Sequence, residues 1–138
     1  MSYKIIGKYI KELNFNIPNP KTFFLLSKYI ANYKINIDIK SSQAKQNIIE
    51  VRTSLGLSPT KNDFETINTK IVFSTIVELD KEKLAKEQVE RIILIDVPTK
   101  IYPDLEKTFL NLIHDSGHPG IKLEKKVDFN KLYNERFN

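Results

Sequence analysis

The stretch "YKINIDI", residues 33–39, shows the most regular hydrophobic pattern in the chain. Its apolar residues occupy the odd positions, from Tyr33 to Ile39, and its polar residues occupy the even positions, from Lys34 to Asp38. Successive side chains of a β-strand point to opposite faces, so this alternation indicates a strand with one apolar and one solvated face. We therefore predict a strand in an antiparallel sheet that is covered on one side.

Two segments further along the chain repeat the alternation. Residues 49–57, "IEVRTSLGL", carry apolar residues or threonine at the odd positions and follow the polar stretch "SSQAKQN" at 41–47, which we interpret as a connector. Residues 67–79, "INTKIVFSTIVEL", show the same period less regularly. They follow the turn-rich stretch "SPTKND". Both segments are predicted strands.

The N-terminal segment "YKIIGKYIKELNF", residues 3–15, also reads as a strand, but with an interrupted pattern. Most of its apolar residues lie at odd positions, where Gly7 and Lys11 leave gaps, and Ile6 and Ile10 lie at even positions. The period of two predicts a long strand with Tyr9 on the odd face and with both faces partly buried.

The connector after this strand, "NIPNPKTFFLLSKYIAN" at 16–32, is unusually apolar. Pro18 and Pro20 exclude a regular strand ladder at its start, and "TFFLLSKYI" at 22–30 has helical character. A connector of this length and composition either covers a core or forms a binding surface.

After Leu79 the hydrophobic period changes to that of a helix. We predict helices in "DKEKLAKEQVERIILI" (80–95), in "PDLEKTFLNLIHDSG" (103–117), where Pro103 suits a first turn and Gly117 a stop, and in "VDFNKLYNERF" (127–137), with Asp128 as the N-cap. Four strands followed by helices predict one α+β domain over residues 1–138, a four-stranded antiparallel sheet with helices packed on one face.

Composition excludes several classes of protein. Apolar residues at 41% and charged residues at 28% are typical of a folded globular chain, and the absence of cysteine excludes disulfides and thiolate chemistry. The net charge is +5, but the lysines of its two clusters alternate with glutamates, which favours a solvated surface over a nucleic-acid interface. No segment has the roughly 20 apolar residues that span a bilayer. We expect a cytoplasmic protein without nucleic acid or membrane insertion. The clusters are Lys81, Lys83 and Lys86, and Lys122, Lys125 and Lys126.

Nothing in the chain indicates an enzyme. His114 and His118 are spaced as helical zinc ligands, but Gly117 and Pro119 should end the helix between them, and the sequence specifies no third ligand. A Gly-rich phosphate loop, a nucleophile elbow and a paired-carboxylate pattern are all missing from the sequence. We therefore expect no catalytic activity, no metal and no cofactor.

Four blocks of sequence stand out along the chain: "YIKELNFNIPNP" (9–20), "SSQ" (41–43), "EQVERIILIDVPTKIYP" (87–103) and "VDFNKLY" (127–133). Together they resemble the SecB family of export chaperones, and they follow the family's order over nearly the whole chain. The resemblance implies that Pro98 and Pro103 bracket a sharp break between two helices. It also implies that Ile101 and Tyr102 pack into the subunit between them.

The function implied by the resemblance is that of an ATP-independent holdase. Such a protein is a homotetramer, a dimer of dimers, that holds unfolded preproteins in apolar grooves and delivers them to the SecA motor. For each groove residue, packing in the core is the alternative role. By resemblance the groove residues are Phe23, Phe24, Leu25, Leu26, Tyr33, Ile35, Ile121 and Leu123.

The resemblance also implies two further surfaces. One is the face that docks SecA, where two family acids are replaced by Asn16 and Thr75. The chain is also basic where the family is acidic, and we expect it to lack the flexible tail that many family members use as a second SecA contact. The alternative is a SecB-like chaperone for another partner, such as a toxin–antitoxin pair. SecA docking is implied for Glu12, Asn16, Phe73 and Thr75, and contacts between subunits for Ser74, Ile76 and Glu78.

Overall fold

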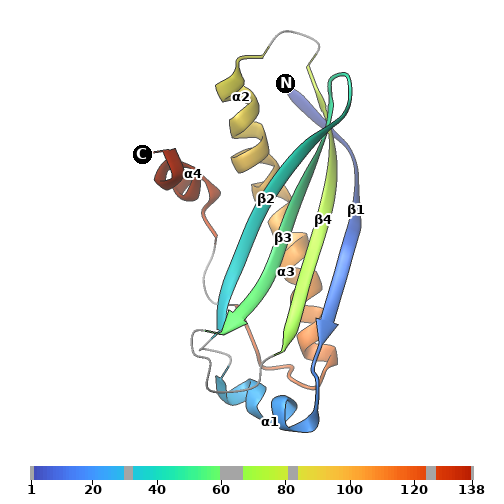
Figure 1. The fold of residues 1–138 in the computed structure, drawn as a ribbon, viewed down its shortest axis with the longest axis vertical. Helices are drawn as coiled ribbons and strands as arrows, with labels where there is room; N and C mark the ends of the chain where they lie inside the picture. Colours follow the sequence, from blue (N-terminus) through green and yellow to red (C-terminus); the bar gives the residue numbers. More distant parts are fainter. Residues whose placement is uncertain (1, 30–32, 60–66, 81–83, 124–126, 138) are drawn as a thin grey trace.

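The computed structural model describes residues 2–29, 33–59, 67–80, 84–123 and 127–137. Its four strands form one antiparallel sheet in the order β1-β4-β3-β2, so β1 and β2 are the edge strands (Figure 1). The predicted α+β class and the four-stranded antiparallel sheet are confirmed. The strands are β1 (Tyr3–Asn16), β2 (Tyr33–Lys45), β3 (Ile48–Pro59) and β4 (Asn68–Leu79).

The helices lie on one side of the sheet and at its ends. The long helix α3 packs against β3 and β4, and α1 lies at the end of the sheet where β1 finishes (Figure 1). We call the side that α3 covers the helix side and the opposite side the open face. The helices are α1 (Pro20–Tyr29), α2 (Lys86–Arg91), α3 (Val97–Asp115) and α4 (Phe129–Phe137), with a π-helical segment η2 (Ile92–Asp96) between α2 and α3.

The core lies between α3 and the two central strands. Leu105, Phe109 and Ile113 recur every four residues along α3 and are fully buried, as are Val51 of β3 and Ile71 of β4. Full burial of one such side chain contributes about 1.5–3 kcal/mol, so this row accounts for much of the attachment of α3. The odd-numbered residues of β3 and β4 therefore face the helix side.

The expected sharp break between the helices is not present. α2, η2 and α3 follow one another without a gap, Pro98 lies in the first turn of α3, and Pro103 lies inside it. The i→i+5 pattern of η2 takes up the irregularity before Pro98, and the Thr99 hydroxyl donates to the Ile95 carbonyl at 2.5 Å. The expectation that Ile101 and its neighbour Tyr102 are buried is confirmed.

The stretch 41–47, predicted as a connector, is mostly strand. β2 continues to Lys45, and only Gln46 and Asn47 form the turn that leads into β3. Asn47 has a φ of 62°, a left-handed conformation that asparagine tolerates better than most residues. The polar composition of residues 41–45 suits a strand whose side chains are exposed, which explains why composition alone was misleading.

β1 departs from the predicted alternation because it contains two β-bulges. Its pairing with β4 shifts between Ile5 and Gly7 and again between Ile10 and Glu12, which leaves Ile6 and Lys11 as extra residues. Each bulge moves the following residues to the opposite face. Tyr9 therefore lies on the open face, and the prediction that it shares a face with the other odd residues is wrong.

Three helix ends follow local sequence rules. The Asn19 side chain accepts a hydrogen bond from the Thr22 amide at 2.9 Å and caps α1, which confirms a helix in the first connector. Asp128 caps α4 as predicted, because its carboxylate accepts from the Lys131 amide at 3.1 Å. Gly117, with a φ of 98°, follows α3 and confirms the predicted stop.

Candidate functional site

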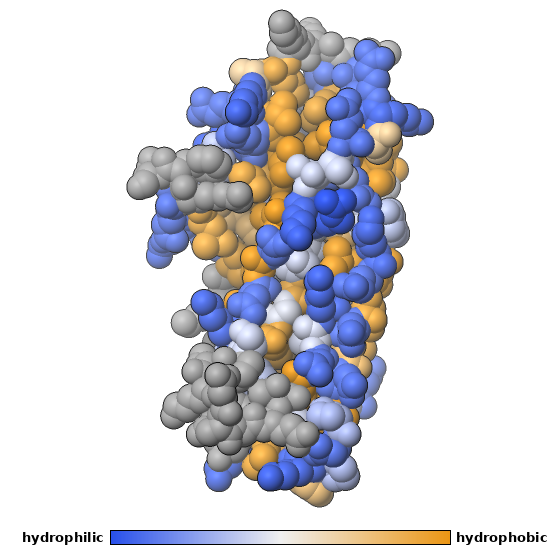
Figure 2. Space-filling view, in the orientation of Figure 1, coloured by the Kyte–Doolittle hydropathy of each residue, from blue (hydrophilic) through white to orange (hydrophobic). Residues whose placement is uncertain are grey.

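A regular row of half-buried apolar side chains lies on the helix side of β2. We call it the β2 strip, and its members are half-buried while the polar residues between them are exposed. Figure 2 shows hydrophobic surface gathered along the groove between this edge of the sheet and α2. The alternation predicted from residues 33–39 is confirmed. The strip consists of Tyr33, Ile35, Ile37 and Ile39.

The second wall beside the β2 strip comes from η2 and α4. Both β2 and α4 contact η2, and Ile93 is a half-buried apolar residue there. α4 is attached by two ring contacts, Tyr102 with Phe129 at 5.8 Å between centroids and Arg91 over Tyr133 at 5.4 Å. The strip therefore lies in a recess between an edge strand and helices rather than under α3.

Residues of α1 that were predicted to bind differ widely in exposure. Phe24 is 72% exposed, Phe23 and Leu25 are half-buried, and Leu26 is buried in the core. The Phe23 ring packs at a tilt against the His118 ring, with 4.7 Å between the two ring centroids. Only part of α1 can therefore meet a ligand in this structure, and Leu26 has the alternative role of packing in the core.

The segment after α3 packs against the core and against the end of α3. Ile121 is buried, Leu123 is half-buried against the core, and Nε2 of His114 lies 2.8 Å from the Ile121 carbonyl oxygen. The two histidines thus make different contacts and do not share a helix face.

The sequence analysis proposed Tyr33 and Ile35 of the β2 strip as binding residues but not Ile37 and Ile39, although all four follow the same alternation.

Tyr33 ties the β2 strip to Ile67, the residue that precedes β4. Its hydroxyl accepts a hydrogen bond from the Ile67 amide at 3.3 Å. Burial raises the pKa of Tyr33, an effect that this hydrogen bond partly offsets. The phenol therefore stays neutral at physiological pH, and its ring offers an uncharged amphipathic surface to a ligand.

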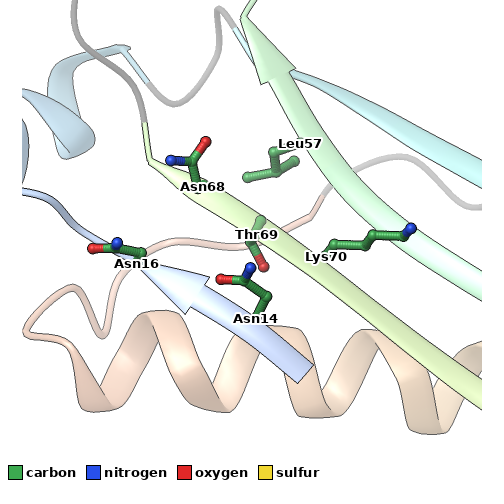
Figure 3. A pocket seen from close by; sticks show the side chains of 6 residues that line it. All are labelled: Asn14, Asn16, Leu57, Asn68, Thr69 and Lys70. Carbon is green, nitrogen blue, oxygen red and sulfur yellow. The ribbon is translucent and has the colours of Figure 1, made fainter. Parts of the chain in front are cut away.

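A separate polar depression of about 310 Å³ lies where β1, β3 and β4 come together at one end of the sheet (Figure 3). Among the described residues that line it, Lys70 is the one that carries a charge. The side-chain amides of its asparagines are available to hydrogen-bond a polar peptide. Its lining consists of Asn14, Asn16, Leu57, Asn68, Thr69 and Lys70.

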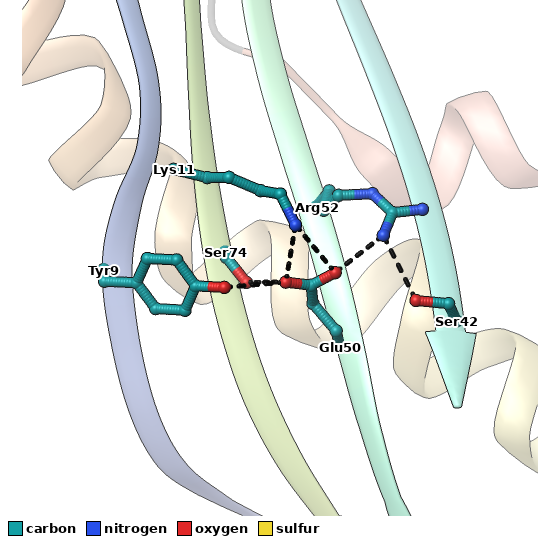
Figure 4. A network of polar contacts seen from close by, with 6 residues as sticks. All are labelled: Tyr9, Lys11, Ser42, Glu50, Arg52 and Ser74. Carbon is teal, nitrogen blue, oxygen red and sulfur yellow. Dashed lines mark hydrogen bonds and ion pairs between the residues drawn. The ribbon is translucent and has the colours of Figure 1, made fainter. Parts of the chain in front are cut away.

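The open face carries a polar network centred on Glu50 (Figure 4). Its carboxylate accepts from the Ser74 hydroxyl at 2.7 Å, the Tyr9 hydroxyl at 2.8 Å, Lys11 at 3.1 Å and Arg52 at 2.6 Å. The hydrogen bonds from Ser74 and Tyr9, followed by those from the two cations, outweigh burial and lower the pKa of Glu50 to about 2. Glu50 is thus ionised at physiological pH, and sequence analysis did not identify it.

The docking residues implied by the resemblance do not share one surface. Glu12 lies on the open face, 3.7 Å from the ammonium of Lys70, and Asn16 is exposed nearby. Phe73 and Thr75 are buried on the helix side. Strand alternation separates the two pairs, because the odd residues of β4 point toward α3.

The residues implied in subunit contacts do lie together. Ser74, Ile76 and Glu78 occupy alternate positions of β4 on the open face. Ser74 is buried through its bond to Glu50, whereas Ile76 is half-buried and Glu78 exposed. Of the three, Ile76 and Glu78 are therefore available to a second chain.

Exposed apolar residues concentrate on β1. Of the six large hydrophobic residues that are exposed in the described ranges, four belong to this edge strand. Unpaired backbone groups and apolar side chains on one edge favour pairing with another chain. The four residues are Ile6, Tyr9, Ile10 and Leu13.

In the described part of the chain, histidine and acidic residues form no cluster of three that could hold a metal ion. None of the described helices is both long enough and apolar enough to cross a membrane. The predicted lysine clusters fall partly on 81–83 and 124–126, which lie outside the described residues.

The chain was compared with known proteins. The family model described as preprotein translocase subunit SecB matches residues 1–138. A Pelagibacter ubique protein provisionally named as the protein-export protein SecB is 47% identical over 137 residues, which cover 99% of this chain and 98% of the relative. The protein-export protein SecB of Anaplasma phagocytophilum is 26% identical, with 96% and 91% covered.

A solved structure shares the fold. It is a SecB-like chaperone of Mycobacterium tuberculosis in complex with a peptide from an antitoxin, and it aligns with a TM-score of 0.65 at 12% identity over 91% of each chain. At this identity the similarity shows a common fold alone. It supports the sheet topology and the placement of α3.

Proposed function

This chain belongs to the SecB family, and from that membership we propose that it is an ATP-independent holdase that binds unfolded preproteins in the cytoplasm and keeps them competent for export. The observation that carries the proposal is the β2 strip. It is apolar and accessible, and it lies on an edge strand that is paired on one side only.

The β2 strip suits an extended, unfolded client. Its free strand edge can hydrogen-bond to any peptide backbone, and its alternating side chains can contact every second residue of the client. Exposed aromatic surface on α1, chiefly Phe24, extends the contact area. Many weak contacts of this kind give tight binding with little sequence preference. Binding of this kind needs no chemical step, which supports a chaperone rather than an enzyme.

We further propose that the chain assembles into a homotetramer, a dimer of dimers. The exposed apolar residues of the β1 edge support pairing with a second copy, because a two-fold axis lets the same surface serve both partners. Ile76 and Glu78 on the open face offer a second surface. Assembly would bring several β2 strips together on one client.

The open face is a poor match for the SecA docking that the resemblance implies. On the open face Glu12 is paired with Lys70, and Glu50 is enclosed by Lys11 and Arg52. These two acids are thus neutralised by neighbouring cations, which weakens attraction to a basic motor surface. The alternative is a SecB-like chaperone that serves another partner, such as a toxin–antitoxin pair, without SecA docking.

The test is a comparison of two aspartate substitutions on neighbouring residues of β2. Ile37→Asp places a charge in the β2 strip, and Asn36→Asp places the same charge on the exposed side. We expect the first variant to lose most of its ability to suppress aggregation of an unfolded preprotein without nucleotide, and the second to match the wild type. Light scattering measures both.

Circular dichroism and thermal unfolding establish that each variant is folded. Equal suppression by Ile37→Asp and the wild type would refute the role of the β2 strip. If the wild type itself does not suppress aggregation, the holdase function is refuted.

A further inference from the structure

The two bulges of β1 invert the middle of the strand. Before Ile6 and after Lys11 the odd residues lie on the helix side, but between the bulges the even residues do, because Ile10 pairs with Phe73 and Tyr9 with Ser74. Two single-residue shifts cancel, so only the short segment from Gly7 to Ile10 is reversed. Nothing in the hydrophobic pattern requires this reversal.

Polar contacts hold the reversed segment from both sides. On the open face the Tyr9 hydroxyl and the Lys11 ammonium bind Glu50 of β3, which lies beyond β4 (Figure 4). On the helix side the Lys8 ammonium lies 2.7 Å from the carboxylate of Asp104 in α3. Lys11 is the extra residue of the second bulge, so its bond to Glu50 acts at the point where the register changes.

Of the two carboxylates that contact the reversed segment, Glu50 binds it more strongly than Asp104 does. The Lys8–Asp104 pair is exposed, and exposed ion pairs contribute roughly 0–1 kcal/mol. The Glu50 side chain is only 13% exposed and accepts from four side chains. Charge-assisted hydrogen bonds are stronger in such a shielded place. Loss of Glu50 would therefore release the reversed segment between the two bulges, whereas loss of Asp104 would not.

The reversal determines which side chains the β1 edge presents. With the bulges in place Ile10 and Leu13 lie on the helix side, opposite Phe73 and Ile71, and remain 49% and 46% exposed. A regular strand would place Lys11 beside Leu13 and send Ile10 to the open face. The bulged form thus joins two apolar side chains into one patch, and the regular form would interrupt that patch with a charge.

We propose that Glu50 is a positioning residue for contact between copies of this chain, because it holds the reversed segment of β1 in the form that presents Ile10 and Leu13 together. Glu50 does not touch the second copy and acts through Tyr9 and Lys11. The inference rests on the assembly proposed above, and it adds the residue that prepares the β1 edge for it.

The test replaces Glu50 with glutamine, which keeps the shape but removes the charge and turns one acceptor into a donor that faces other donors. We expect Glu50→Gln to raise the dissociation constant for assembly by about tenfold or more, and to speed amide exchange at residues 8–12. Sedimentation equilibrium and hydrogen exchange measure the two effects. Glu12→Gln is the matched control, because it removes the same charge from an exposed ion pair that joins β1 to Lys70 of β4, and it should change the constant by less than about twofold.

A second variant protects the test against loss of folding. Tyr9→Phe keeps the ring and removes only the hydroxyl, so it should weaken assembly in the same direction, and the double variant with Glu50→Gln should be less than additive. A wild-type dissociation constant and unchanged β1 exchange in Glu50→Gln would overturn the positioning role alone. A wild type that stays monomeric would overturn both the assembly and this role.

Discussion

The two edge strands of the sheet follow the same hydrophobic rule with different outcomes. β2 pairs with β3 without a register shift from Tyr33 to Gln43, and its apolar residues all face the helix side. β1 is of similar length but contains two bulges, and its middle segment is reversed. The period of two therefore describes β2 from Tyr33 to Gln43, up to the register shift before Lys45, and β1 only at its ends.

The difference lies in what each strand contacts. Alternate side chains of β2 meet a continuous apolar layer, so a slip of one residue would expose every isoleucine of the β2 strip. The middle of β1 meets charges on both sides, Glu50 on the open face and Asp104 on the helix side. Long-range polar contacts can thus override local periodicity where little apolar burial is lost.

The largest expected effect comes from a substitution in the core, because the core supports both edge strands of the sheet. Leu105 of α3 is fully buried, and Leu105→Ala should lower the free energy of unfolding by about 2–5 kcal/mol through lost burial and the cavity left behind. Because α3 lies on β3 and β4, both edge strands should lose protection together. Urea unfolding and amide exchange measure this, and loss of protection in β2 alone would contradict a common core.

The next effect distinguishes the two edge strands by their response to pH. The folded pKa of Glu50, about 2, lies below the ordinary value of 4.5, so the folded state binds fewer protons than the unfolded state in this range. The stability that Glu50 supplies is therefore complete above about pH 4.5 and is lost as the pH falls toward 2. We expect a loss on the order of 1–3 kcal/mol, with β1 amides exchanging faster before those of β2.

The reference for this titration is Glu50→Gln. Its stability should change less between pH 4.5 and 2, because the group that titrates is absent. Equal acid sensitivity in wild type and variant would assign the loss to other carboxylates and would weaken the distinction between the two strands.

The smallest expected effect concerns β2 alone. Asn47 adopts a φ of 62° in the turn that joins β2 to β3, and alanine in this left-handed conformation costs about 1 kcal/mol. Asn47→Ala should lower the urea midpoint slightly and leave assembly through β1 unchanged, whereas Asn47→Gly should be nearly neutral. A change in the assembly constant would show that the edges are coupled.

Much of the fold could be predicted from the sequence. The four strands, the helices after Leu79, the cap at Asp128 and the stop at Gly117 all follow from local rules and are observed. The β2 strip follows from the same rules, although the sequence analysis proposed only Tyr33 and Ile35 of its members as binding residues. The stretch 41–45 was missed, because exposed strand residues resemble a polar connector in composition.

The site on the open face could not be predicted in this way. Glu50 lies in an alternating segment where any polar residue would fit, and its partners Tyr9 and Lys11 are about forty positions away in the chain. The separation of Phe73 and Thr75 from Glu12 likewise depends on which side of β4 meets α3. A sequence shows which residues share a face of one strand, but not which faces of two strands come together.

By itself the sequence determined the class of each element, because strand alternation and helical spacing are properties of a few neighbouring residues. The tertiary structure decided the reversal of the middle of β1 and the continuous passage from α2 through η2 into α3. It also decided which apolar residues, Leu26 and Ile121 among them, are core and which remain accessible. These features depend on contacts between distant segments, which exist only once the sheet and α3 have packed together.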